Sequence, residues 1–234
     1  AIANIQTELA ENLTLDVGFD SRFYKGLHYR NVRDLLGSDG YRDSRYNGTP
    51  NTNGVVAATQ EYKWPIGDVW NVFGDTDAEE KIDRNNNGVI NYFGLYFQLE
   101  YLMDDVSIFV QGSGSNKGYQ REEFYLYGAG DPLQYSDKVN IAGGTIKAGA
   151  NWNIDAQNNL FANAGYFSKQ PNLNAVFQNY DQFPTADDQL FNEKIVGLEL
   201  GYGFRSKSFD FNVNLYSTTW TDRFLYENVT INGE

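Results

Sequence analysis

The segment that decides the fold is Val196-Gly197-Leu198-Glu199-Leu200-Gly201-Tyr202-Gly203-Phe204. Every second residue in it is apolar or aromatic, and the residues between are glycine or glutamate. A period of two places the two kinds of side chain on opposite faces of an extended strand. After residues 205–208 the alternation resumes from Phe209 to Leu215, with aspartate and asparagine between the apolar positions. We therefore predict two antiparallel strands joined by a short turn, each with one apolar and one polar face.

The same alternation recurs toward the N-terminus. It is clear in residues 13–20, 93–101 and 106–111, and weaker in 138–154 and 159–169. In 138–154 the apolar residues change parity at Gly143-Gly144, and we predict a β-bulge there that restores one consistent face. Together these segments predict seven strands, with a partial strand at each end of the chain.

The predicted connections alternate between short and long. Short turns are expected at 10–11, 103–105, 155–158 and 205–208, and long connections at 25–91, 119–135 and 170–192. Alternating loop lengths between long amphipathic strands are typical of transmembrane β-barrels. We therefore predict an all-β, antiparallel transmembrane β-barrel. A soluble β-sandwich, which also has alternating strands and glycine-rich turns, is the structural alternative.

Composition excludes several other classes of protein. The 234 residues carry a net charge of −13, no cysteine and one histidine, and the mean hydropathy is −0.54. No run approaches the roughly 20 apolar residues of a membrane-spanning helix. Disulfide frameworks, cysteine nucleophiles and multi-histidine metal sites are excluded. Nucleic-acid binding is disfavoured because it depends on clustered lysine and arginine.

Aromatic residues gather near the ends of the predicted strands. In a membrane barrel such residues form girdles at the two membrane–water boundaries, although aromatic residues are also favoured in strands generally. The expected girdle residues are Tyr24, Tyr101, Trp152, Tyr166, Tyr202, Phe204 and Trp220.

Several segments, in this order, resemble the barrel of TonB-dependent outer-membrane receptors. An aromatic-Ser-basic run leads into a Pro-Asn-Leu loop, and a Glu-Lys…Glu-Leu-Gly-Tyr strand, a turn and a further strand follow. An early segment is similar to the versions found in Bacteroides-type bacteria. The segments are residues 163–174, 192–194, 199–202, 205–209, 214–216 and 220–223, with the early one at 23–30.

The resemblance implies a barrel of about 22 strands filled by an N-terminal plug. Residues 1–234 would be part of the barrel domain, with the plug and the C-terminal strands absent from this chain. The implied function is active uptake, across the cell outer membrane, of a scarce nutrient: a siderophore, haem, a cobalamin-like molecule or an oligosaccharide. The implied partners are outer-membrane lipid and lipopolysaccharide, TonB through the missing N-terminal region, and a surface lipoprotein. The alternative function is a secreted carbohydrate-binding β-sandwich module.

One short motif suggests a metal ion. Asp83-Arg84-Asn85-Asn86-Asn87-Gly88 has the Asp-x-Asn-x-Asn-Gly spacing of a calcium loop. The candidate ligands are Asp83, Asn85 and Asn87. The twelfth position is Gly94 instead of glutamate, and Asn-Gly is also an ordinary turn sequence, which is the favoured interpretation. Calcium in an extracellular loop is the only cofactor suggested.

Two other groups of residues bear on function. Tyr62, Trp64 and Trp70 lie in the long connection 25–91, where they would offer aromatic surfaces to a substrate. Adjacent acids at 104–105, 122–123 and 187–188 are expected to be solvated, although paired carboxylates are also the machinery of glycoside hydrolysis. We expect no catalytic residues and no enzymatic activity.

Overall fold

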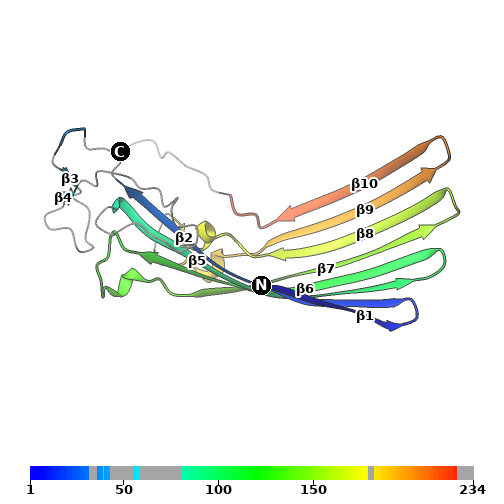
Figure 1. The fold of residues 1–234 in the computed structure, drawn as a ribbon, viewed down its shortest axis with the longest axis horizontal. Helices are drawn as coiled ribbons and strands as arrows, with labels where there is room; N and C mark the ends of the chain where they lie inside the picture. The colour runs from blue at the N-terminus through cyan, green and yellow to red at the C-terminus, as the bar shows by residue number, and fades with distance from the viewer. Residues whose placement is uncertain (32–35, 39, 43–54, 58–80, 179–181, 226–234) are drawn as a thin grey trace.

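The computed structural model describes residues 1–31, 36–38, 40–42, 55–57, 81–178 and 182–225. Its main element is one eight-stranded sheet with the order β1-β2-β5-β6-β7-β8-β9-β10, in which every neighbouring pair is antiparallel. A second sheet holds only β3 and β4. The prediction of an all-β, antiparallel fold is confirmed, and the sheet is open, with β1 and β10 as its edges (Figure 1).

The strands of the main sheet are long, and the helical elements are short. The strands are β1 (Ile2–Ala10), β2 (Leu13–Asn31), β5 (Lys81–Leu102), β6 (Val106–Glu123), β7 (Val139–Asn153), β8 (Asn158–Lys169), β9 (Glu193–Arg205) and β10 (Asp210–Thr221), with β3 (Gly40–Arg42) and β4 (Val55–Ala57) apart. The helical elements are η3 (Pro132–Gln134), α1 (Leu173–Val176) and η5 (Asp187–Gln189). No helix in the described part of the chain is both long and apolar enough to cross a membrane.

All four predicted short turns are confirmed, and they lie at one end of the sheet. They join β1 to β2, β5 to β6, β7 to β8 and β9 to β10, at the right of Figure 1. The tight turn between β1 and β2 places Asn12 at a φ of 66°, a conformation that asparagine tolerates better than most residues. The longer connections leave from the other end.

The strands β2 and β5 extend further than the alternation predicts. Their ladder continues through the pairs Leu27–Asn87 and Tyr29–Asn85, and ends at Asn31–Lys81 after a register shift. The predicted long connection 25–91 therefore shrinks to 32–80, and the favoured turn at Asn87-Gly88 is wrong. The alternation signal ends earlier than the ladder because polar and apolar side chains no longer alternate regularly there, while main-chain pairing continues.

Strand register aligns the side chains into two chemically distinct faces. One row of successive partners runs across six strands through Leu15, Leu99, Val110, Ala148, Ala164 and Leu198. The next row, on the opposite side, runs through Asp16, Gln98, Gln111, Lys147, Gly165 and Gly197. We name the side of Leu198 the apolar face and the side of Lys147 the polar face.

The predicted bulge at Gly143-Gly144 is wrong. The register of β6 and β7 is unbroken from Tyr119–Val139 to Val106–Trp152. The parity change therefore moves Val139 and Ile141 onto the polar face. There they pack, with Ile90, Leu173 and Leu190, against a small core of Tyr119, Val176 and Phe177. The segment 170–192, which contains α1, supplies the cover that makes apolar residues favourable on this face.

Candidate functional site

Large side chains on the apolar face are exposed along the whole width of the sheet. Leu95 is 57%, Leu198 55% and Leu215 65% exposed. The described residues place no second layer over this face. Soluble monomers rarely expose contiguous apolar surface of this extent. The half-exposed members of the face include Val17, Phe19, Phe93, Phe97, Tyr101, Ile108, Val110, Ile146, Trp152, Tyr166, Val196, Leu200, Tyr202, Phe211 and Val213.

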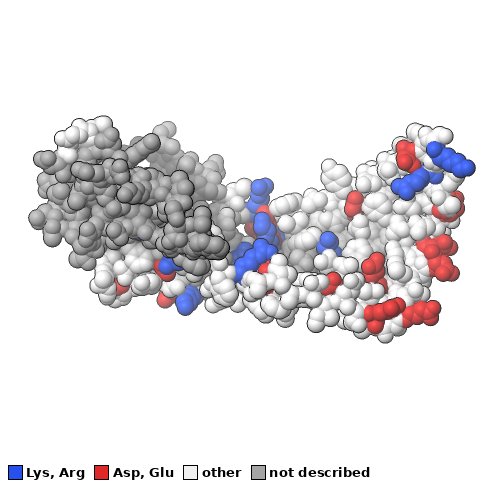
Figure 2. Space-filling model, in the orientation of Figure 1, with Lys and Arg blue, Asp and Glu red and all other residues white. Residues whose placement is uncertain are grey.

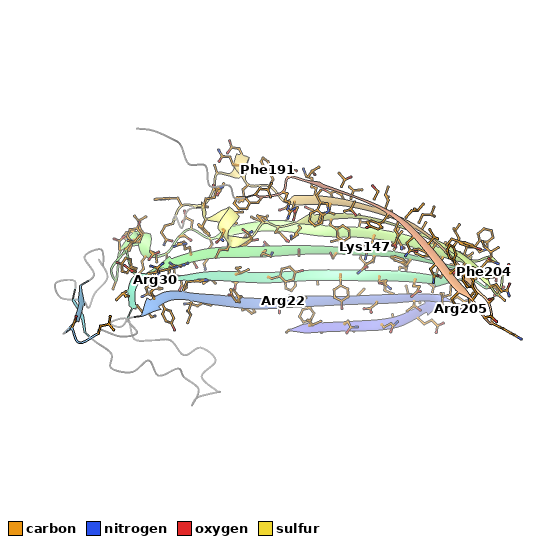
Figure 3. The ribbon with its side chains drawn as sticks, turned by 90° about the horizontal axis from the view of Figure 1, so that it is seen from above. Arg22, Arg30, Lys147, Phe191, Phe204 and Arg205 are labelled. Carbon is orange, nitrogen blue, oxygen red and sulfur yellow. The ribbon has the colours of Figure 1, made fainter. Side chains whose placement is uncertain are left out.

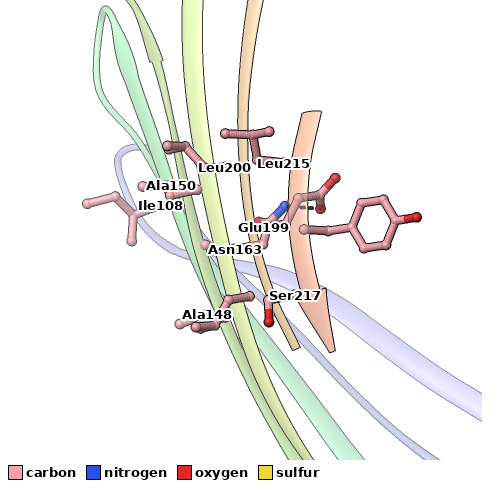
Figure 4. Close-up of a pocket in the computed structure, with 13 residues that line it drawn as sticks. Ile108, Ala148, Ala150, Asn163, Glu199, Leu200, Leu215 and Ser217 are labelled. Carbon is pink, nitrogen blue, oxygen red and sulfur yellow. Dashed lines mark hydrogen bonds between the residues drawn. The ribbon is translucent and has the colours of Figure 1, made fainter. Parts of the chain in front are cut away.

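A shallow hollow lies at mid-height on the apolar face (Figure 4). Its volume is about 670 Å³, and its floor is formed by the alanines of β7 and β8, at positions 148, 150, 162 and 164. Ile108, Leu200 and Leu215 stand around these small residues. Figure 4 also draws a hydrogen bond on the polar face, where Asn163 Nδ2 donates to Glu199 Oε2 at 3.1 Å. The apolar hollow and this polar hydrogen bond thus lie on opposite sides of the same strands.

Five of the seven expected girdle residues have the parity of the apolar face. Tyr101, Trp152, Tyr202 and Phe204 lie near the short turns, and Tyr166 lies toward the other end. Tyr24 and Trp220 have the opposite parity, because their direct partners Ile90 and Ile195 lie on the polar face. The expectation is therefore wrong for these two residues.

The apolar face has a definite height along the strands. On β5 it extends from Phe93 to Tyr101. The eight residue steps from Phe93 to Tyr101 span about 27 Å. If the strand is tilted by about 40° from the membrane normal, the apolar face is about 20 Å high, which is close to the roughly 25 Å apolar band of membrane barrels.

The polar face carries a hollow of its own, with a volume of about 510 Å³. The opposed pair Gly165–Gly197 lies at its base, and no atom lies within 4 Å of the position a Cβ at Gly197 would take. Phe109, Phe167 and Tyr216 supply aromatic surface, and Lys147, Asn163 and Glu199 supply an ammonium, an amide and a carboxylate. This combination suits contact with a water-soluble ligand.

Segment 170–192 folds back over the polar face near the ends of β5, β6 and β7. The Tyr119 hydroxyl donates to the Pro171 carbonyl, and Gln170 Nε2 donates to Ser115 Oγ at 2.8 Å. The Leu173 side chain occupies the space that a Cβ at Gly88 would need. The segment is also tied internally, because Thr185 N–H donates to the Val176 carbonyl at 2.7 Å. These contacts hold the described part of the segment, residues 170–178 and 182–192, over the polar face.

Charge is unevenly distributed along the sheet. Exposed acids occupy three of the four short turns, at Glu11, Asp104, Asp105 and Asp155, and Figure 2 shows acidic side chains gathered at that end. Arg205, in the fourth turn, is drawn beside Phe204 at the same end in Figure 3, whereas Arg30 lies toward the other end.

The proposed substrate-binding residues Tyr62, Trp64 and Trp70 lie outside the described residues. The proposed calcium ligands Asp83, Asn85 and Asn87 all lie in β5. Asp83 has a φ of 58° at the register shift opposite Arg30, whose Nη1 lies 3.5 Å from Asp83 Oδ2. Asn85 and Asn87 are 5% and 6% exposed. No group of three or more His, Asp or Glu side chains in the described residues is arranged to hold a metal.

The acids Glu122 and Glu123 are partnered and largely buried, so the expectation that they are solvated is wrong. Glu122 Oε2 lies 2.7 Å from Lys25 Nζ and accepts a hydrogen bond from Asn87 Nδ2. Glu123 forms an ion pair with Arg121 at 3.0 Å, where both side chains are under 10% exposed. The local sequence does not reveal the partners of Glu122, because Lys25 on β2 and Asn87 on β5 become its neighbours only through strand pairing. Asp104 and Asp105 are exposed, as expected.

Comparisons of the chain with protein-family models, with curated proteins and with solved structures gave no match. The functional argument therefore depends on the geometry of the two faces and on the motifs of the sequence.

Proposed function

We propose that the sheet is one arc of a transmembrane β-barrel in the cell outer membrane, with the apolar face toward lipid and the polar face toward a water-filled lumen. The observation that carries this proposal is the exposed apolar face, which continues in register across the sheet. Inside a bilayer every backbone polar group needs a partner within the protein. Antiparallel pairing meets this need in the interior of the sheet, and barrel closure would meet it at β1 and β10.

We assign the barrel to the TonB-dependent class, which takes up a scarce nutrient such as a siderophore, haem, a cobalamin-like molecule or an oligosaccharide. The order of the motifs between residues 163 and 223 supports the assignment, and so does the gathering of short turns at one end. In this proposal the barrel performs no chemistry. TonB supplies energy through a region outside this chain, and a surface lipoprotein is a candidate partner for capture.

The hollow on the polar face and the cover formed by 170–192 would both lie on the lumen side. The cover packs over the ends of β5, β6 and β7 that lie away from the short turns. It would narrow the conduit at the end where the longer connections emerge. A solute would pass the cover before it met the aromatic and charged side chains around Gly165 and Gly197.

The test compares one charge on each face at the same height. Leu198 pairs with Ser217 on the apolar face, and Thr218 is the adjacent residue on the polar face. Lysine at a lipid-facing midplane position costs about 2–4 kcal/mol. We expect Leu198→Lys to lower insertion of the chain into phosphatidylcholine vesicles, scored by protection of the strands from protease. Thr218→Lys should insert like the unaltered chain, and equal tolerance at both positions contradicts the proposal.

The secreted β-sandwich predicts a different behaviour. A sandwich core needs a second sheet packed about 10 Å above the apolar face, and the described residues supply only the two short strands β3 and β4 besides the main sheet. A chain that is soluble and monomeric without detergent would favour the sandwich and would contradict the membrane proposal.

A further inference from the structure

A further hollow, lined by both polar and apolar side chains, lies on the lipid side of the sheet, just beyond the apolar face. Its volume is about 360 Å³, and its lining includes Asn91, Asn116, Gly118, Gln120, Lys138 and Asn140. Successive pairing places Phe23, Asn91, Gly118 and Asn140 in one row across β2, β5, β6 and β7. This row has the parity of the apolar face, so the amides project toward the lipid side and away from the lumen.

Gly118 keeps the middle of the hollow open. A Cβ at Gly118 would lie 3.0 Å from Asn140 Oδ1 and 3.8 Å from Asn91 Cβ. The missing side chain therefore leaves a gap between two amides that would otherwise be filled. Asn91, Asn116 and Asn140 are all exposed, so their donors are accessible from the lipid side.

The hollow has exposed aromatic and apolar side chains on one side and a lysine ammonium on the other. Phe23 and Phe93, which also line it, are 83% and 52% exposed. Below them, Leu95 is exposed beside Gly114, which has no atom within 4 Å of its Cβ position. Above the amides, Lys25 is paired with Glu122, and exposed Lys138 lies in the lining.

We propose that this hollow binds the phosphorylated headgroup of an outer-leaflet glycolipid, an inference that rests on the membrane placement proposed above. Aromatic side chains mark the boundary between hydrocarbon and headgroups in membrane proteins. Immediately beyond that boundary, amides donate to phosphate and sugar oxygens, and Lys138 supplies the positive charge that a phosphate prefers. The acyl chains lie along Leu95 and the open surface at Gly114. A lipid fits better than a protein partner because the hollow, with its amides, its ammonium and its aromatic rings, continues directly into the apolar face.

The test uses the full chain in neutral detergent micelles, titrated with diphosphorylated lipid A and with the same glycolipid lacking its phosphates. Native mass spectrometry counts the retained lipid. We expect retention of the phosphorylated form to exceed that of the dephosphorylated form, and Lys138→Gln to weaken it about tenfold, as loss of one charged hydrogen bond implies. Gly118→Leu should weaken both by filling the hollow. Lys207→Gln, which makes the same change in net charge in a short turn, is the matched control.

Three results would overturn the headgroup site: equal retention of the two lipids, equal weakening by Lys138→Gln and Lys207→Gln, or displacement of lipid A by equimolar inorganic phosphate, which would indicate a free-anion site. The vesicle assay separates this failure from that of the proposed function. Insertion of the unaltered chain into phosphatidylcholine vesicles, combined with equal retention of the two glycolipids in micelles, removes the headgroup site alone. Failure to insert into any vesicle removes both.

Discussion

The ring of Phe109 on β6 lies across Gly149, its direct partner on β7. A Cβ placed on Gly149 would come within 2.5 Å of Phe109 Cε1, and closer still to Oδ1 of Asn163, its partner on β8. The same relationship joins Tyr96 to Gly18 and Phe161 to Gly201, again between direct partners on the polar face. Aromatic rings thus cover glycines where the polar face would otherwise expose bare backbone.

Substitution of Gly149 tests this packing. Gly149→Ala should lower the free energy of unfolding by about 1–3 kcal/mol, because the Phe109 ring and the Asn163 amide both have to move. The control is Gly197→Ala on the same face, where a Cβ meets no atom within 4 Å. Urea unfolding in micelles measures both. Equal losses of stability would show that neither the Phe109 ring nor the Asn163 amide is held over Gly149.

The buried ion pair of Arg121 and Glu123 predicts a large effect from a small change. Glu123→Gln removes the carboxylate that lies 3.0 Å from the buried Arg121 guanidinium, and loss of one member of a buried ion pair costs about 3–5 kcal/mol. Arg205, which lies 3.6 Å from Asp210 and is 85% exposed, is the comparison. Arg205→Gln should change stability by less than about 1 kcal/mol. Similar effects of the two variants in urea would contradict burial of the first pair.

The turn between β7 and β8 predicts a dependence on pH. Hydrogen bonds from the backbone N–H of Gln157 and from Asn158 hold the pKa of Asp155 below its ordinary value. A depressed carboxyl pKa stabilises the fold above the unfolded-state pKa, and this contribution is lost as pH falls through the folded-state pKa. Asp155→Ala should therefore destabilise the chain at pH 6 and much less near pH 2.5. Gln157→Ala is the control, because Gln157 binds Asp155 through its backbone N–H, which alanine keeps. The effect of this variant on stability should not change with pH.

The cover over the polar face depends on Tyr119. Tyr119→Phe removes the hydrogen bond to the Pro171 carbonyl, which is worth about 0.5–1.5 kcal/mol. We expect faster hydrogen exchange at the amides of Ala175, Val176 and Phe177, and unchanged exchange in β9. Tyr135→Phe alters an exposed hydroxyl and should leave both regions as they are. Exchange that rises uniformly through the sheet would show that 170–192 is not a separate cover.

Much of the sheet could be predicted because alternation carries the signal wherever one face is apolar. The paired strands around Leu198 and Leu215 and all four short turns follow from this pattern. The ladder from Tyr24 to Asn31 could not be predicted, because polar and apolar residues do not alternate regularly there although main-chain pairing continues. The parity of Val139 and Ile141 suggested a bulge, because the residues that cover them on the polar face come from a segment about 30 residues further along the chain.

Less of the site could be predicted, because its residues become neighbours only through the pairing register of the strands. The partner of Glu122 is Lys25, almost 100 positions earlier, and no local motif marks that pair. The hollow on the polar face and the one beyond the apolar face arise where glycines fall beside larger residues on neighbouring strands, at Gly197 and at Gly118. Each glycine is visible in the sequence, but its neighbours are set by strand pairing.

The order of the sheet also has a consequence for how the chain assembles. Every neighbouring pair in the main sheet except β2–β5 follows directly in sequence, apart from the short helical elements between them. Most pairs can therefore form as local hairpins, whereas β2 and β5 close the connection 32–80. The entropy cost of closure rises with loop length, and non-local pairing slows folding. The β1–β2 hairpin should consequently join a preassembled β5–β10 meander last, and shortening residues 43–54 should accelerate that final step.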